Sequence, residues 1–264
     1  MSRGRTAKVL AHRYGEGALR RQPDHLIVEE PLEIQLDGTL VATTMRTPGD
    51  DFELAAGFCF TEGLLAGAPV RRCRYCATGS AVTSEFNVVT VDTGGRAPAP
   101  VPRLTPITSA CGMCGTTAID VLRDRLQPLG PRPRVALDVL AGLPGSLGDQ
   151  ELFGVTGAVH AAAAFDGSGR AVVAREDVGR HNAVDKVVGR LLLDGALPAG
   201  DLGLWVSGRA SFEIVQKAWA AGIGTVVAVS APSSLAVSAA RMAGMTLCGF
   251  ARAGRLNVYT GLEG

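Results

Sequence analysis

The chain lacks an excess of charge of either sign. Its 264 residues carry 26 basic and 25 acidic side chains, so the formal net charge is +1. Proteins that bind nucleic acid or an anionic membrane usually carry a strong basic excess. We therefore expect neither partner. Because hydrophobic residues make up 47% of the chain and charged residues 19%, the composition also excludes a disordered protein and is typical of an enzyme.

The chain also lacks a segment that would export or anchor it. Residues 1–24 hold six basic side chains against two acidic ones, without the apolar run of about 7 to 15 residues that a secretory signal needs. We expect a basic flexible arm there and a cytoplasmic protein. Residues 218–240 are uncharged, but glycines, Pro232 and two serines interrupt them. A membrane helix needs about 20 continuous apolar residues, so we expect no span.

A stretch with four prolines and two glycines, residues 94–106, predicts a linker between two domains. We place an α+β domain at 25–105. Apolar residues alternate over 25–45 around an Asp37-Gly38 turn, which predicts a β-hairpin. Asp50 and Glu53 predict an N-cap and capping box for a helix that continues to residue 65, and 85–91 is the next expected strand.

In the second domain, residues 106–264, the order of the expected strands and helices is typical of an α/β fold. Helical spacing begins near residue 119, and a hairpin is expected at 159–174. Three strands (202–206, 225–230, 245–250) then alternate with three helices (181–193, 211–221, 233–243). Such alternation predicts a largely parallel sheet with helices outside it.

Four of the six cysteines form two Cys-x-x-Cys pairs, Cys73 with Cys76 and Cys111 with Cys114. In a chain that is not exported, this spacing favours metal or thiol chemistry over disulfides. The second pair is flanked by glycines and precedes a helical pattern, where a thiol pKa falls. The four thiols together could equally hold zinc. Cys59 and Cys248 lie in apolar segments and are expected in the core.

Three turns that suit anions share one topological position. Residues 207–211, 230–234 and 251–255 each follow an expected strand and supply serines, glycines or arginines. The carboxyl ends of parallel strands are where ligands bind, and helix N-termini attract phosphates. The ionisable run at 175–182, which includes His181, lies ahead of another helix. Together these segments predict a nucleotide-like anion site.

Five motifs together resemble the FdhD family of formate dehydrogenase accessory sulfurtransferases, over residues 25–261. They are CGMCG at 111–115, REDVGRHNAVDK at 175–186, SGRASFEIVQK at 207–217, VSAPSSLAV at 229–237 and GFARAGRLNVYTG at 249–261. The resemblance implies a C-terminal three-layer α/β domain with the cytidine deaminase fold. A deaminase would show His-x-Glu at His160, and the glutamate is absent, so deaminase activity is the least favoured function.

The resemblance implies a sulfurtransferase that takes persulfide sulfur from a cysteine desulfurase onto Cys111, with Cys114 as its partner. The sulfur goes to the molybdenum bis(molybdopterin guanine dinucleotide) cofactor, which formate dehydrogenase requires. A homodimer, no metal site and no permanent cofactor are expected. Cys73 and Cys76 depart from the family motif, so a zinc-containing cofactor chaperone is the alternative. The expected cofactor-binding residues are Ser207, Gly208, Arg209, Ser233, Ser234, Arg180, His181, Phe250, Ala251, Arg252, Ala253, Gly254 and Arg255.

Overall fold

The computed structural model describes residues 4–76, 85–100, 125–146 and 150–262. Within them, the chain forms a two-stranded, a four-stranded and a six-stranded sheet. The expected helix around residues 119–124 and the expected domain boundary at residue 105 lie outside the described ranges. The α/β class expected from the sequence is the observed one.

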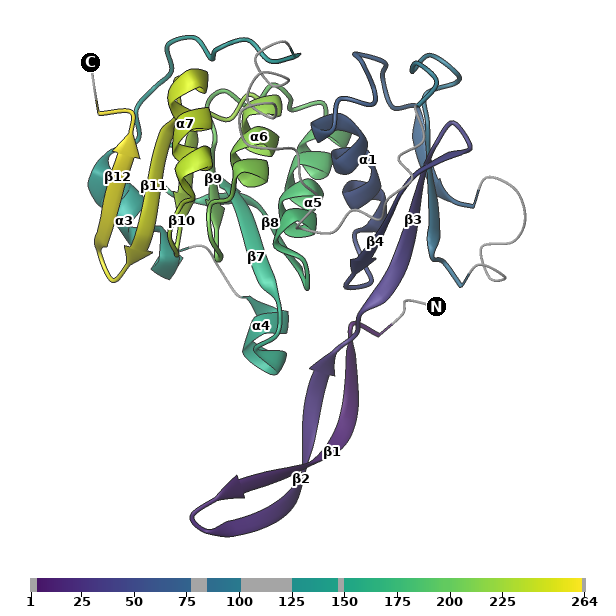
Figure 1. The fold of residues 1–264 in the computed structure, drawn as a ribbon, viewed down its shortest axis with the longest axis vertical. Coiled ribbons are helices and arrows are strands. Elements are labelled where there is room, and N and C mark those ends of the chain that lie inside the picture. Colours follow the sequence, from purple (N-terminus) through teal and green to yellow (C-terminus); the bar gives the residue numbers. More distant parts are fainter. Residues whose placement is uncertain (1–3, 77–84, 101–124, 147–149, 263–264) are drawn as a thin grey trace.

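The expected flexible arm is a regular β-hairpin. Strands β1 (Thr6–Gly15) and β2 (Ala18–Ile27) pair antiparallel over their whole length. Glu16 and Gly17 both have positive φ, which a two-residue hairpin turn requires. The hairpin extends away from the body of the molecule (Figure 1), and most of its side chains are exposed. The arm is therefore solvated as expected, but it has secondary structure that the sequence reading missed.

The four-stranded sheet has the order β4-β3-β6-β5. Strands β3 (Glu30–Leu36) and β4 (Thr39–Arg46) form the expected hairpin around Asp37-Gly38, and β6 (Val88–Asp92) runs parallel to β3. Strand β5 (Arg72–Tyr75) was not expected. Leu32, Ile34 and Leu36 alternate into the core that this sheet shares with helix α1, because alternate residues of a strand face one side.

Helix α1 (Asp51–Thr61) begins where expected, with Asp50 at the N-cap position, but it is shorter than expected. Asp50 has left-handed backbone angles and its side chain makes no capping hydrogen bond. Glu53 contacts Arg175 and does not close a capping box. The helix stops at Thr61, and Gly63 follows with a φ of +76°, a conformation that ends helices. The capping box and the continuation to residue 65 were wrong.

The six-stranded sheet has the order β12-β11-β10-β9-β7-β8 and is mixed, where a largely parallel sheet was expected. Only β9 (Gly203–Val206), β10 (Thr225–Ala228) and β11 (Thr246–Arg252) run parallel. The hairpin of β7 (His160–Phe165) and β8 (Ala171–Asp177) joins β9 antiparallel. At the other side, β12 (Arg255–Thr260) turns back along β11, because the chain makes a tight turn there and not a helical crossover.

Helices cover both faces of this sheet, as three layers require. Helices α5 (Arg180–Leu193), α6 (Phe212–Ala220) and α7 (Ser234–Ala243) stand side by side on one face (Figure 1). Helix α3 (Leu137–Ser146) packs on the other face, and the short α4 (Glu151–Thr156) lies near β2. None of the helices in the described part of the chain has the length and apolar character to cross a membrane. The expected likeness to the cytidine deaminase fold stays a prediction.

Candidate functional site

The predicted anion turns meet along one edge of the six-stranded sheet. Strands β9 and β10 end in the loops 207–211 and 230–234. The Ser230 amide donates to the Gly208 carbonyl (3.2 Å), and the Phe250 amide donates to the Ser230 carbonyl (3.2 Å). The two loops and Phe250, here named the carboxyl edge, are therefore held in register by the backbone. The sequence correctly placed these three segments side by side.

Two of the predicted serine hydroxyls accept hydrogen bonds from backbone amides. The Ser207 hydroxyl accepts a hydrogen bond from the Ala161 amide (2.9 Å). The Ser233 hydroxyl caps α7 by accepting from the Ala236 amide (3.1 Å). Arg209 and Ser234 are exposed at the same edge. Ordinary capping thus accounts for Ser233, while the exposed pair is available to a ligand.

A group of basic side chains gathers behind Gly208. A Cβ at this glycine would lie 3.4 Å from Nδ1 of His160 and 3.8 Å from Cδ of Arg180. Burial first, and then the positive charges of Arg180, His181 and Arg209, lower the pKa of His160. The buried Nε of Arg180 has no hydrogen-bond partner among the described residues. Because these positive groups repel one another, a bound anion would stabilise their charged forms.

His181 joins the first turns of α5 and α6. Its Nε2 lies 2.7 Å from a carboxylate oxygen of Glu213 and 3.2 Å from the hydroxyl of Ser211. Burial acts to raise the pKa of Glu213, but the hydrogen bond from His181 and the nearby positive charges outweigh it, so the pKa is lowered. Glu213 therefore stays charged and holds His181 in place. Sequence reasoning missed Glu213, although it follows the SGRAS loop by two residues.

The segment from Phe250 to Arg255 forms the turn between β11 and β12. Arg252 and Arg255 face each other across the two strands, and both are exposed. Phe250, Ala253 and Gly254 have positive φ. This turn closes a β-hairpin, so unlike the other two loops it does not lead into a helix. What it offers an anion is its pair of arginines.

Arg252 also lines a cavity of about 600 Å³ that contains His160 and Ser207. Trp205 forms part of its wall and is only 3% exposed, and its Nε1 has no hydrogen-bond partner in the part of the chain that the structure describes. A buried donor without a partner costs free energy, which a ligand acceptor could recover. Nothing in the sequence signalled Trp205, because its position at this cavity depends on the sheet order.

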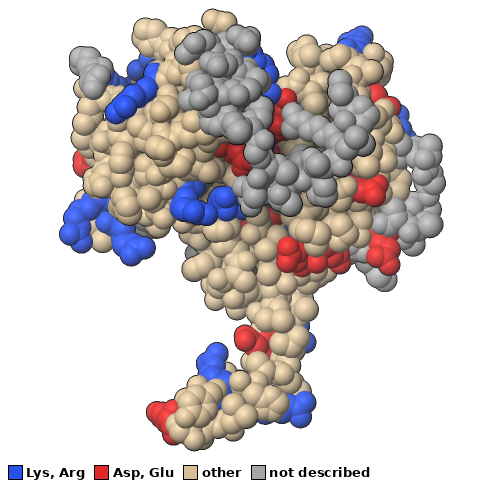
Figure 2. Space-filling view, viewed as in Figure 1, with Lys and Arg blue, Asp and Glu red and all other residues tan. Residues whose placement is uncertain are grey.

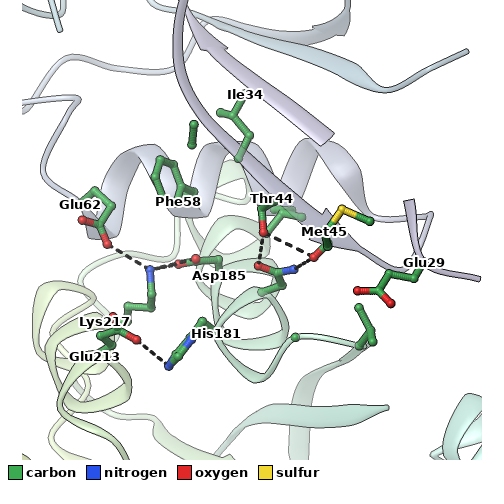
Figure 3. A pocket seen from close by; sticks show the side chains of 15 residues that line it. Glu29, Ile34, Thr44, Met45, Phe58, Glu62, His181, Asp185, Glu213 and Lys217 are labelled. Carbon is green, nitrogen blue, oxygen red and sulfur yellow. Dashed lines mark hydrogen bonds and ion pairs between the residues drawn. The ribbon is translucent and has the colours of Figure 1, made fainter. Parts of the chain in front are cut away.

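The molecule has two halves, the four-stranded sheet with α1 and the six-stranded sheet with its helices. A second cavity, of about 380 Å³, lies between these two halves. Figure 3 shows Lys217 pointing at Asp185 and Glu62, with His181 and Glu213 beside them. The Lys217 ammonium donates to both carboxylate oxygens of Asp185 at 2.9 Å. Further along, Asn182 donates to the Met45 carbonyl (2.8 Å). The polar groups of this cavity mostly bind one another.

The run 175–186 mainly joins the two halves of the molecule. Arg175 forms an ion pair with Glu53 of α1, with Nη2 and Oε1 separated by 2.8 Å. Asp177 and Lys186 form a fully buried ion pair at 2.8 Å. Arg180 and His181 differ from these residues because they face the carboxyl edge. The predicted site in this run thus narrows to these two side chains.

The predicted catalytic residues, Cys111 and Cys114, lie outside the described residues. Cys59 and Cys248 are fully buried in apolar clusters, as expected, and burial raises the pKa of Cys248 to about 11. Burial likewise raises the pKa of Cys73 to about 11. No group of three or more metal ligands occurs within the described ranges. Because a four-cysteine zinc site would need the second pair, the zinc alternative stays untested.

The family can be identified from the match of the whole body of the chain. The model of the FdhD/NarQ family matches residues 27–264. The chain belongs to the FdhD/NarQ family. The matched region starts at the last residue of β2, so the hairpin β1–β2 precedes it.

Curated relatives of this FdhD/NarQ protein are named "Sulfur carrier protein FdhD". The one from Streptomyces coelicolor is 49% identical over 261 residues, which covers 95% of this chain and 92% of the relative. The one from Mycobacterium tuberculosis is 46% identical and covers 90% and 91%. A crystal structure described as a formate dehydrogenase accessory protein from Desulfotalea psychrophila has the same fold. Its TM-score is 0.74 at 24% identity, over 98% of this chain and 99% of that one.

Proposed function

We propose that this protein is a sulfurtransferase required for formate dehydrogenase activity. It accepts persulfide sulfur from a cysteine desulfurase in the cytoplasm and transfers it to molybdenum bis(molybdopterin guanine dinucleotide), which is a substrate here and not a resident cofactor. The names of its relatives support sulfur carriage, and the description of the Desulfotalea psychrophila protein supports formate dehydrogenase as the recipient.

Cys111 takes up the sulfur by thiol exchange. Its thiolate attacks the outer sulfur of the desulfurase persulfide, the S–S bond breaks and the desulfurase thiolate leaves. The sulfur and its oxidation state pass unchanged, so this step needs no oxidant. A thiolate is required for the attack, and the glycine-flanked sequence ahead of a helical pattern favours one.

Cys114 releases the sulfur. Its thiolate attacks Sγ of Cys111, which breaks the persulfide bond, forms a Cys111–Cys114 disulfide and frees hydrosulfide for the molybdenum centre. A cellular dithiol must then reduce the disulfide and restore both thiols. The two-residue spacing suits this reaction, since Cys-x-x-Cys pairs readily close to disulfides.

The basic group at the carboxyl edge is the observation that carries the proposal. Arg180, Arg209 and Arg252 lie around His160, and the buried Arg180 Nε has no partner among the residues that the structure describes. The acceptor cofactor carries two pyrophosphate groups, and guanidinium groups form strong charge-assisted hydrogen bonds with such anions. A homodimer would present two of these edges to a ligand with two nucleotide ends.

Transfer of labelled sulfur tests the proposal. Cysteine with labelled sulfur and a cysteine desulfurase should label the wild-type chain but not Cys111→Ala. Cys114→Ala should take up the label and release it more slowly, because it lacks the second thiol. Cys73→Ala is the matched control and should behave as the wild type.

If the protein were instead a zinc-containing chaperone, metal analysis of the same purified chain would detect bound zinc. About one zinc per chain, lost when any of the four cysteines is changed, would contradict the sulfurtransferase. Labelled sulfur on the Cys111→Ala variant would also contradict the sulfurtransferase.

A further inference from the structure

A third cavity lies at the opposite edge of the six-stranded sheet. It has a volume of about 630 Å³ and is lined by residues 129–134, the start of β10 and β11, and the end of β12. Strand β10, with four residues, separates it from the carboxyl edge by about 13 Å. Among the basic side chains on the face shown in Figure 2, one group lies near the end of β12 and another around the β11–β12 turn. The two regions are distinct.

Three arginines line this cavity, Arg132, Arg134 and Arg241, and no acidic side chain is among its described lining residues. Within the described ranges, none of the three makes an ion pair or a side-chain hydrogen bond. The Nε of Arg132 is buried and finds no hydrogen-bond partner within those same ranges. Three guanidinium groups thus share one cavity without a counter-charge.

The position of Arg132 is set by two glycines on separate loops. Its side chain lies against Gly200 and Gly224, and a Cβ at Gly224 would lie 2.6 Å from its Cδ. Any larger residue at Gly224 would displace the arginine. The guanidinium is therefore placed by the fold and is not simply a solvated surface group.

A cation near the end of a helix often only balances the helix dipole, and Arg241 lies in the last turn of α7. Here the carbonyls of that end already have partners. The Gly244 amide donates to the Arg241 carbonyl (3.1 Å), and the Leu129 amide donates to the Ala243 carbonyl (2.9 Å). Arg132 and Arg134 moreover come from a different segment. Balancing the helix end does not account for three arginines.

We propose that this arginine cavity binds a phosphorylated small molecule of nucleotide size. Guanidinium forks match phosphate oxygens in pairs, and the partly exposed Tyr259 lines the same cavity and offers an aromatic surface for the organic part. The volume falls within the roughly 300 to 1,000 Å³ that is usual for small-molecule sites. The site is separate from the carboxyl edge and does not depend on the sulfurtransferase proposal.

Calorimetry with ADP tests this site in the full chain. The background variant Arg252→Gln/Arg255→Gln weakens the carboxyl edge first, and in it one ADP per chain should still bind. Adding Arg134→Gln/Arg241→Gln should weaken this binding about 100-fold, since each lost charge-assisted contact accounts for about 10-fold. All four arginines are exposed, so folding should be unchanged, and circular dichroism checks this.

Chemical modification locates the ligand. ADP should protect Arg134 and Arg241 from p-hydroxyphenylglyoxal in the same background variant, as read by mass spectrometry. Absence of ADP binding there, or equal affinity after the second pair of substitutions, would overturn the proposal. Binding of a hexaglutamate peptide in place of ADP would also overturn it and would assign the cavity to an acidic protein partner.

Discussion

Gly57 of α1 and Gly189 of α5 meet backbone to backbone where the two halves of the molecule join. A Cβ on Gly57 would overlap the carbonyl oxygen of Asp185, and a Cβ on Gly189 would overlap that of Glu53. Only glycine permits helices to approach so closely. This crossing fixes α5, whose first turn carries Arg180 and His181, relative to the four-stranded sheet.

Gly189→Ala should lower the free energy of unfolding by about 1 to 3 kcal/mol, the usual cost of overpacking. Urea denaturation measures it. Gly142→Ala in α3 is the control, because a Cβ there meets no atom within 4 Å, and alanine should stabilise that helix by about 0.5 to 1 kcal/mol. Equal stability of Gly189→Ala and the wild type would contradict the close crossing.

Lys217→Met should be severely destabilising, by about 3 to 5 kcal/mol, because it leaves the carboxylate of Asp185 buried without its partner. Both side chains are at least 96% buried, with 4% and 3% exposed. The double variant Lys217→Met/Asp185→Asn should lose less than the sum of the two single variants. Additive losses in thermal or urea unfolding would show that the pair does not interact as described.

Binding of GDP at the carboxyl edge should take up a proton. Burial and the charges of Arg180, His181 and Arg209 hold the pKa of His160 below 6.5, and a bound phosphate would raise it again. Affinity should therefore increase as the pH falls from the raised pKa of His160 in the complex towards its lowered pKa in the free protein.

Calorimetry in buffers of different ionisation enthalpy measures this proton uptake. His160→Gln should abolish it, whereas His181→Gln, the control, should keep it. Uptake that persists in His160→Gln would rule out His160 as the titrating group.

The features of the fold that could be predicted are those that arise from residues close together in the sequence. The Asp37-Gly38 turn and the strand and helix alternation after residue 202 are local patterns, and the structure has them. The mixed sheet was missed because strand direction depends on which strands become neighbours. Glu53 was misread as a capping residue because its partner, Arg175, lies 122 positions away.

The residues of the candidate site likewise fall into those that a local sequence pattern predicted and those that only the strand pairing places. Loops 207–211 and 230–234 were predicted to share an edge, because carboxyl ends of parallel strands meet there. His160 and Trp205 reach the same edge only through β7 and β9, which pair antiparallel. No sequence pattern predicts that pairing, so the cavity that they line could not be foreseen.

GDP should bind the carboxyl edge more tightly than ADP, because the proposed substrate carries guanine. Arg252→Ala and Arg255→Ala should each weaken GDP binding by roughly 10- to 100-fold, since charge-assisted hydrogen bonds contribute about 1.5 to 3 kcal/mol. Calorimetry of the two nucleotides is the measurement, with each variant made in the Arg134→Gln/Arg241→Gln background so that the arginine cavity does not contribute. Equal affinity for GDP and ADP, or unchanged GDP affinity in Arg255→Ala, would contradict this placement of the ligand.

Mass spectrometry of the thiols shows whether Cys111 carries the sulfur. The full chain is incubated with a cysteine desulfurase and cysteine, and its thiols are then alkylated, digested and mapped. We expect one added sulfur atom on Cys111. Added sulfur only on Cys73 or Cys76, with Cys111 unmodified, would contradict the proposed role of Cys111.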